Sequence, residues 1–545
     1  MDRMSRNKIL YSQTSVWCLA VCCLTAISVA RAGHIAFMSG YGEGSHFMVQ
    51  AIIGDELARR GHNVTGFISQ AYEDKLKTPM YTQFSPDLKF KAYEHATSAN
   101  EIRFVYNQLT DWVIEGKFLK SVIMEFLFTL KIPTNFLIED CDFLLGNDTF
   151  MDMFRSLELD LVIADSYYPC SVLLAEAVEA QYVSFCPTNL NPHFAHVQGT
   201  TLLPSIYPSG ESYLSQRMNF FQRFHNSLVY LKEKFFIRFL LWLYNPLRKK
   251  YNLNAQWTTR EALSRSSLWL YDSDFYIDYP APMLPNTVMV GGITTRPSNP
   301  LNKEVLEFAD SAGDDGFIIF SLGTYVVNLK QDMNIMLAEA FSKLPQKVFW
   351  QLSSDVDVKL PPNVKPMKWL PQNDLLGHPN CKLLLYQSGV NGLYEALYHS
   401  VPIIAIPFAW DQPDVASRIV GRKIGQSLDF WSMTADDIIS TVTAVINDTS
   451  YKENIVKLSA AWRDQKQHPK ERAADSIEHV IKHGGEIMRF YGSELNFAQY
   501  YLLDVTAFSI FMVYVIICIF RCLIRCHMKF YYYRVSISKA KLKGC

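Results

Sequence analysis

The chain has 545 residues, of which 49% are hydrophobic, 14% aromatic and 19% charged. This composition is apolar enough to build large packed cores, and it excludes a disordered or fibrous protein. The formal net charge is −1, so there is no overall basic field and we expect no nucleic-acid partner. The mean hydropathy is near zero, which fits a soluble body joined to one or two membrane segments.

The first segment of the chain is typical of a secretory signal peptide. Three basic residues precede an apolar stretch at 16–29, and Ala30 and Ala32 supply the small residues of a cleavage site before Gly33. We therefore expect residues 1–32 to be removed. An uncleaved membrane anchor is the alternative interpretation.

Short apolar runs then alternate with a helical pattern. Residues 34–38 and 64–68 are predicted strands, and the helical periodicity of 47–60 lies between them. Another predicted strand, 159–164, is followed at once by Asp165. This βαβ alternation indicates a mostly parallel sheet with helices on both faces.

Two aromatic segments, 112–136 and 228–247, are apolar and contain scattered lysines. Both have the pattern of amphipathic helices. Their apolar faces could pack in the core, line an acceptor pocket or lie on a membrane surface, and the sequence leaves these alternatives open.

A second alternating series follows three prolines, of which the last is Pro285. Its predicted elements are the strands 317–320, 347–352, 382–386 and 403–406 and the helices 332–344 and 392–399. We therefore expect two Rossmann-like domains, 33–285 and 286–499, facing each other across a cleft. Ligands should bind at the carboxyl ends of the strands.

Residues 500–524 form an apolar segment long enough to cross about 30 Å of hydrocarbon. Seven Lys or Arg residues and no Asp or Glu follow Phe520. The positive-inside bias places the tail 525–545 in the cytosol and the body in the lumen. Lys541 and Lys543 resemble a dilysine signal for retrieval to the endoplasmic reticulum. A buried core helix is the alternative for this segment.

Four cysteines would remain in the lumenal body. They are too few for a disulfide framework, their pairing is not determined by the sequence, and none shows a paired metal spacing. These residues are Cys141, Cys170, Cys186 and Cys381. Glycosylation sequons occur at three positions, Asn63, Asn147 and Asn447.

The segment Tyr386–Gly392 follows an apolar strand and opens a predicted helix. Free backbone N–H groups at such a helix start favour an anion. A tight strand-to-helix turn would have the same sequence pattern, so the surrounding order matters. That order is Trp369, Pro371, Gln372, His378 and Pro379 before the loop and Glu395, Pro402, Pro407, Asp411 and Gln412 after it.

In this order and spacing, residues 369–412 resemble the signature of the membrane-bound animal UDP-glycosyltransferases. The resemblance extends over nearly the whole chain and includes the turn Gly44–His46 and the stretch Ser321–Thr324. It implies a GT-B fold, a UDP-sugar donor, a small lipophilic acceptor, inversion at the anomeric carbon and no metal in the transfer. It implies no cofactor beyond the UDP-sugar. Whether the protein forms homo- or hetero-oligomers stays open.

The resemblance also implies a role for each matching residue in donor binding. Trp369 would stack on uracil, Gln372 would bond to its edge or to the ribose, and Glu395 would accept the ribose hydroxyls. The diphosphate would lie on the loop between the strand and the helix, and Ser321 would approach it from another strand end. Two residues that follow this helix in sequence would bind the sugar hydroxyls. The loop residues are Gln387, Ser388, Gly389, Asn391 and Gly392, and the pair is Asp411 and Gln412.

His46 and Asp165 follow predicted strands, so both can face the cleft. A neutral imidazole can take a proton from an acceptor hydroxyl. A carboxylate at its other nitrogen would fix the tautomer and stabilise the imidazolium. We expect His46 to be the general base and Asp165 its partner.

One departure from the family pattern concerns the loop. Its first position is His in the family and Gln387 here, followed by Ser388 in place of Gly. Glutamine donates only a neutral hydrogen bond, and charge-assisted bonds are about twice as strong. The alternative function is therefore a catalytically weak relative that binds a UDP-sugar, or a partner subunit, without efficient transfer.

Three Asp-x-Asp triplets begin at Asp140, Asp272 and Asp355. Metal-dependent transferases hold a divalent cation with such pairs. None of the three follows a strand in a matching context, so we predict surface carboxylates.

Asp272 also bears on the donor sugar. By alignment it takes the position where users of UDP-glucuronate place an Arg that meets the sugar carboxylate. An Asp would repel that carboxylate, and the family resemblance implies that Gln412 goes with gluco-configured sugars and not with galactose. The sequence therefore predicts UDP-glucose, with Arg296 as an alternative partner for a glucuronate carboxylate.

Overall fold

The computed structural model describes residues 32–40, 44–102, 104, 133–323, 326, 329–352 and 358–542. The signal segment up to residue 31, most of the aromatic segment 112–136, the triplet at Asp355 and the tail residues 543–545 lie outside them. The described chain divides into two units, Met1–Arg489 and Phe490–Cys545.

A seven-stranded parallel sheet forms the first half of the larger unit. Its strand order is β3-β2-β1-β4-β5-β6-β7. The bounds are β1 His34–Met38, β2 Asn63–Ser69, β3 Leu88–Tyr93, β4 Leu161–Asp165, β5 Gln181–Cys186, β6 Trp269–Tyr271 and β7 Thr287–Met289. The central strands β1 and β4 are short apolar runs, as expected for strands that are covered on both faces, whereas the edge strand β3 contains two lysines. Strand β7 lies just beyond the expected domain boundary at 285.

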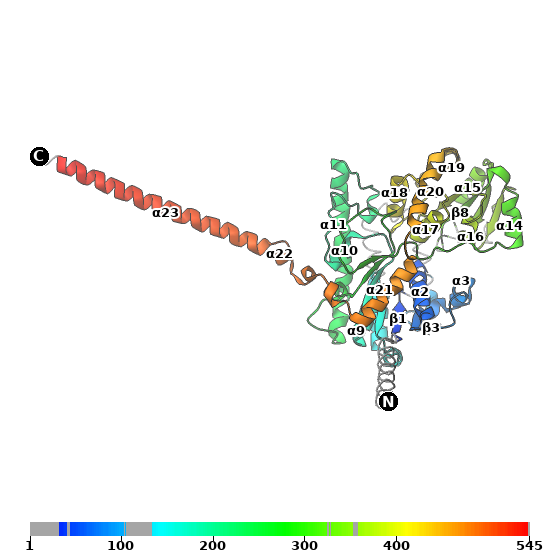
Figure 1. The fold of residues 1–545 in the computed structure, drawn as a ribbon, viewed down its shortest axis with the longest axis horizontal. Coiled ribbons are helices and arrows are strands. Elements are labelled where there is room, and N and C mark those ends of the chain that lie inside the picture. Colours follow the sequence, from blue (N-terminus) through cyan, green and yellow to red (C-terminus); the bar gives the residue numbers. More distant parts are fainter. Residues whose placement is uncertain are drawn as a thin grey trace, which may run out of the picture. The chain divides into compact units, whose positions relative to one another are not determined.

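Apolar side chains pack on both sides of this sheet. The helices that accompany it are α2 Gly44–Arg59, α3 Pro79–Thr82, α7 Glu139–Gly146, α8 Asp148–Arg155, α9 Cys170–Ala177, α10 Pro192–Gln198, α11 Phe220–Leu243, α12 Asn245–Lys250 and α13 Thr259–Ser264. From the far end of the unit, α21 Pro469–His483 returns to pack against α2 (Figure 1).

The second sheet has six parallel strands in the order β10-β9-β8-β11-β12-β13. They are β8 Phe317–Ser321, β9 Lys347–Gln351, β10 Val364–Met367, β11 Cys381–Tyr386, β12 Ile403–Ala405 and β13 Gly425–Ser427. Two further apolar clusters cover its faces. The helices around it (Figure 1) are α14 Lys303–Asp310, α15 Gln331–Ser342, α16 Gln372–Leu376, α17 Val390–Tyr398, α18 Gln412–Gly421, α19 Ala435–Asn447 and α20 Thr449–Arg463.

Each sheet has a topological switch point, where the strand order reverses. In the first sheet it lies between β1 and β4, and in the second between β8 and β11. Loops at the carboxyl ends of such neighbouring strands run in opposite directions and leave room for a ligand. The expected Rossmann-like organisation of both halves is therefore present.

The smaller unit consists of α22 Phe497–Tyr500 and the long helix α23 Leu503–Leu542. The helical segment Leu503–Lys539 is long and apolar enough to cross a membrane. The predicted span 500–524 begins in α22 and continues into α23, and the basic tail continues the same helix.

Candidate active site

His46 and Asp165 meet at the switch point of the first sheet. Asp165 is the last residue of β4, and His46 lies in the first turn of α2, which follows β1. The distance from His46 Nδ1 to Asp165 Oδ2 is 2.8 Å. Asp165 is buried, whereas His46 keeps about a third of its side-chain surface exposed. The imidazole can therefore meet a ligand while its partner stays out of water.

Both oxygens of Asp165 are held. The backbone N–H of Tyr167 donates to Oδ1 at 2.9 Å, and Oδ2 faces the imidazole. Because a carboxylate accepts, Nδ1 of His46 carries the proton and Nε2 keeps a lone pair. The Tyr167 ring lies 6.0 Å from the His46 ring. Tyr167 was not predicted, and its position two residues after Asp165 was the only signal for it.

Two more carboxyl groups act on His46. Burial lowers the pKa of the imidazole, but the charge of Asp165, and to a smaller extent that of Asp411, outweighs this effect, so the net pKa lies above the ordinary 6.5. Burial raises the pKa of Asp411 to about 6. Burial, together with the charge of Asp411, raises the pKa of Asp272 to about 8. At neutral pH, Asp411 is mostly ionised and Asp272 mostly protonated.

The predicted phosphate loop lies at the switch point of the second sheet. Gly389 precedes the first turn of α17, and no side chain caps this helix start. Its first backbone N–H groups are therefore available to an anion. A Cβ atom at Gly323 would collide with the amide of Gln387, which also lies close to Gly389. Gln387 thus bridges the loop after β8 and the start of α17.

Ser321 and Ser388 flank this loop. Ser321 ends β8, and its hydroxyl bonds to the Gln351 side chain at 2.5 Å. Ser388 is fully buried with a left-handed backbone, φ 69°. Asn391 and Gly392 lie in the first turn of α17, where a Cβ at Gly392 would press on the Tyr386 ring.

Gln372 and Glu395 form a direct pair. Gln372 begins α16, and its amide donates to Glu395 Oε2 at 2.8 Å. Burial raises the pKa of Glu395 to about 7. Trp369, three residues before Gln372, is 54% exposed. An exposed indole offers an apolar ring face on which a planar group can stack.

Asp411 and Gln412 mark the start of α18. The amide oxygen of Gln412 accepts the backbone N–H of Phe408 at 2.8 Å, so its NH₂ group remains for other partners. The preceding Trp410 is half exposed and has φ 60°. Such a backbone is unusual for a bulky residue and was not predicted.

The prediction of surface carboxylates was wrong for Asp140, Asp272 and Asp274, which are all buried. Asp140 binds His95, whereas burial near Asp411 explains the protonated state of Asp272. Among the described residues, no group of three or more His, Cys, Asp or Glu side chains is arranged to hold a metal ion.

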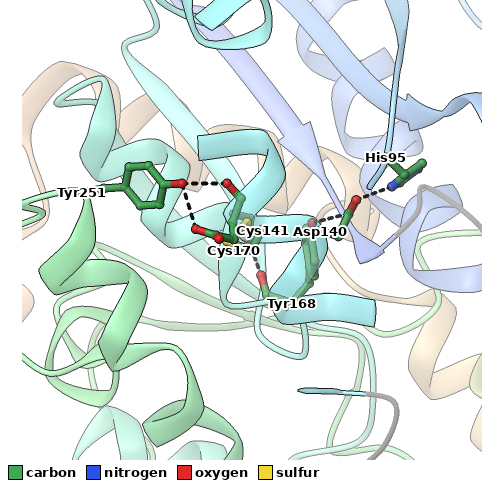
Figure 2. The surroundings of a disulfide bond; sticks show 8 residues. His95, Asp140, Cys141, Tyr168, Cys170 and Tyr251 are labelled. Carbon is green, nitrogen blue, oxygen red and sulfur yellow. Dashed lines mark hydrogen bonds and ion pairs between the residues drawn. A yellow bond between two sulfur atoms is a disulfide. The ribbon is translucent and has the colours of Figure 1, made fainter. Parts of the chain in front are cut away.

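A disulfide joins Cys141 in α7 to Cys170 at the start of α9. Figure 2 shows that the same place holds a chain of hydrogen bonds. Asp140 accepts from His95 Nδ1 at 2.7 Å and from the Tyr168 hydroxyl at 3.3 Å. The short segment between Asp165 and Cys170 is therefore held at both ends.

Comparisons with known proteins show the family of the chain. A sequence model of the family "UDP-glucoronosyl and UDP-glucosyl transferase" matches residues 38–540. UDP-glucuronosyltransferase 2B33 of Macaca mulatta is 34% identical over 504 residues, which cover 90% of this chain and 92% of the relative. UDP-glucuronosyltransferase 2B7 of Homo sapiens is 33% identical with the same coverage. The chain belongs to this UDP-glycosyltransferase family.

Two solved structures are similar in fold to this chain. The glycosyltransferase of kitacinnamycin matches with a TM-score of 0.56 at 19% identity, covering 83% of this chain and 100% of that chain. CalG4, the calicheamicin glycosyltransferase, matches with a TM-score of 0.53 at 18% identity, covering 83% and 99%. The predicted GT-B fold is confirmed. The protein is a glycosyltransferase of the UDP-sugar-dependent type that acts on small acceptors.

Proposed function

We propose that this UDP-glycosyltransferase transfers glucose, with inversion, from UDP-glucose to a hydroxyl of a small lipophilic acceptor. The observation that carries the proposal is the 2.8 Å contact of His46 Nδ1 with Asp165 Oδ2, at a switch point and within the field of Asp411. This contact would orient His46 as a base, and Asp411 would be available for the sugar hydroxyls.

In the proposed step, Nε2 of His46 takes the proton of the acceptor hydroxyl. The acceptor oxygen forms a bond to C1 of the sugar, and the bond from C1 to the diphosphate oxygen breaks. The electron pair leaves with UDP, and the open N-terminus of α17 stabilises the charge that develops there. Asp165 stabilises the imidazolium that forms. Attack opposite to the leaving group inverts the anomeric centre.

The donor residues keep the roles that the family resemblance implied. The exposed ring of Trp369 would stack on uracil, and the Gln372–Glu395 pair would bind the base edge and the ribose hydroxyls. The pKa of Glu395, about 7 in the absence of ligand, leaves part of its carboxyl groups protonated at neutral pH. Asp411 and the NH₂ group of Gln412 would hold the sugar.

The choice of glucose still rests on Asp272, but not on charge repulsion. Because its pKa is about 8, Asp272 does not repel a glucuronate carboxylate by charge at neutral pH. It also offers no positive partner, whereas its Oδ1 has no hydrogen-bond partner among the described residues and suits a sugar hydroxyl. Arg296 binds both oxygens of Asp374, at 2.6 and 3.2 Å, and is therefore occupied. The names of the relatives favour UDP-glucuronate as the competing donor.

The alternative of a catalytically weak binding protein rests on Gln387, which places a neutral amide at the loop. The chain keeps the residues that we propose as the base, its partner and the sugar-binding pair, so we favour transfer. We further propose that the protein resides in the endoplasmic reticulum membrane, with the body in the lumen and a short basic tail in the cytosol, because the apolar part of α23 is followed by that tail.

The test is a competition assay with the purified full-length chain in detergent. UDP-glucose, UDP-glucuronate and UDP-galactose compete for one phenolic acceptor, and hydrolysis of each donor is followed without acceptor. Preferential transfer of glucose supports the proposal. Preferential transfer of glucuronate would overturn the choice of donor, and binding of UDP without transfer or hydrolysis of any donor would favour the binding protein.

A further inference from the structure

Helix α11 has two apolar faces. One faces the interior and contributes Tyr230, Ile237, Leu240 and Leu241 to the protein core, so this part of the aromatic segment 228–247 does pack inside. A globular surface helix normally turns a polar face to solvent on the opposite side. Here the opposite side is apolar as well.

The outer face carries large side chains at helical spacing. Each of them is more than half exposed, and three- and four-residue steps place them along one stripe. We call this stripe the outer α11 face. It consists of Phe220, Phe221, Phe224, Leu228, Leu231, Phe235 and Trp242. Scattered apolar residues need no explanation, but a continuous stripe of this size marks an interaction site.

Basic residues flank the outer α11 face on both sides. At 100° per residue, Arg223, Lys234 and Arg238 lie along one edge, and Lys232 lies along the other. Lys232 also contacts Glu211. The single acid of the helix, Glu233, is buried on the inner side. The stripe and its cations match a helix that lies in a lipid interface, where acyl chains meet the apolar face and anionic headgroups meet the cations.

We propose that the outer α11 face lies in the surface of the membrane that α23 spans, as a second contact of the catalytic body with lipid. The candidate anchor α23 keeps the body of the same chain within reach of a bilayer. Phe235 and Phe239 contact each other, and Phe239 contacts Trp242; Phe, Trp and Leu are the side chains typical of the apolar face of an interfacial helix. The inference does not depend on the donor sugar or on the base.

Charge disfavours two other occupants. In a symmetric dimer through this face, the basic edges of the two copies would meet like charges. The chain's own segment 105–132, outside the described residues, has three acidic and three basic residues. It offers no excess of acid to complement the edges. A membrane surface with anionic lipid supplies such an excess.

The test uses the full-length chain, one molecule per nanodisc of phosphatidylcholine and phosphatidylserine. Cys518, Cys522, Cys526 and Cys545 are replaced by Ser, and an environment-sensitive fluorophore is attached through Leu231→Cys or, as a second site, Phe224→Cys. Lys303→Cys in α14, 91% exposed at its side chain, is the matched control. Nitroxide-labelled lipid quenches from the bilayer, and iodide quenches from water.

The labels on α11 should show blue-shifted emission, quenching by lipid and protection from iodide, and the label at residue 303 should show the reverse. Replacing Arg223, Lys234 and Arg238 by Gln should at least halve the lipid quenching at Leu231→Cys. Quenching by iodide but not by lipid at both α11 sites would place the face in water and overturn the proposal. Protection from both quenchers would mean that protein covers the face, which also overturns it.

Discussion

Arg418 and Asp278 form an ion pair that is completely excluded from solvent, with 2.7 Å between Nη2 and Oδ1. Arg418 lies in α18 of the second half, and Asp278 lies in the loop between β6 and β7 of the first half. The same carboxylate accepts the Tyr207 hydroxyl at 2.7 Å and the backbone N–H of Leu190 at 2.8 Å. The helix that begins at the proposed sugar-binding pair is therefore joined to the half that contributes the base.

Breaking this pair should destabilise the protein strongly. Asp278→Ala removes one of the two carboxylates that contact the buried Arg418, the other being Asp414, and leaves the backbone N–H of Leu190 without its acceptor. Breaking a buried pair in this way costs up to about 3–5 kcal/mol of unfolding free energy. Denaturant unfolding of the catalytic body in detergent, followed by tryptophan fluorescence, measures this. Arg59→Ala removes a surface pair with Asp55 and should change the stability by less than about 1 kcal/mol. Equal effects of the two substitutions would contradict a structural role for the buried pair.

His46→Ala should abolish most transfer while UDP binding stays nearly normal. The base acts on the acceptor hydroxyl and not on the nucleotide, and general-base catalysis typically contributes about 10²–10⁴-fold. Turnover with a phenolic acceptor and calorimetric titration with UDP separate the two effects. Weakened UDP binding with preserved turnover would remove His46 from the chemistry.

Much of the fold could be predicted because parallel strands covered on both faces are continuous apolar runs. The predicted strand 317–320 became β8, and 382–386 became β11, each within one residue. His46 and Asp165 could be predicted as partners because residues after neighbouring parallel strands meet at one edge of a sheet. The family motif located the loop at Gln387 in the same way.

Burial of individual carboxyl groups could not be predicted. Asp140 is buried and its carboxyl group is satisfied by His95, 45 residues away, and no local pattern distinguishes such an Asp from a solvated one. The pairing of the disulfide could not be predicted either, since four cysteines allow three pairings. The raised pKa of Asp272 comes from its burial and, to a smaller extent, from the charge of Asp411 in the other half, so only the folded structure reveals it.

The disulfide Cys141–Cys170 should contribute to turnover as well as to stability. Cys170 lies five residues after Asp165, and the bond from Tyr168 to Asp140 holds the same segment (Figure 2). Cys141→Ser/Cys170→Ser should cost about 2–4 kcal/mol and should lower kcat more than it changes the KM for the donor. The exposed Cys522→Ser is the control. If the double variant lost stability but kept wild-type kcat, the disulfide would not position Asp165.

The pH dependence of kcat/KM should show an acid limb above pH 6.5. A base acts only when it is unprotonated, and Asp165 raises the pKa of His46 above its ordinary value. Activity should therefore fall as the pH decreases through that raised pKa. In Asp165→Asn the raising charge is gone, so the limb of the residual activity should move to lower pH. A limb that stays in place would mean that another group titrates.

Gln387→His should strengthen donor binding or raise the rate. The Gln387 amide lies between Gly323 and Gly389, beside the uncapped start of α17, so an imidazole there would be close to a bound diphosphate. When protonated, it replaces a neutral hydrogen bond by a charge-assisted one, a net gain of about 1 kcal/mol or about fivefold in UDP affinity. The gain should grow as the pH is lowered from 8 to 6, since only the imidazolium provides it. Gln387→Ala, which removes the donor group, should weaken binding and serves as the matched control. Equal UDP affinity and turnover in all three proteins would show that the diphosphate does not lie against this side chain, and the proposed cradle would then be wrong.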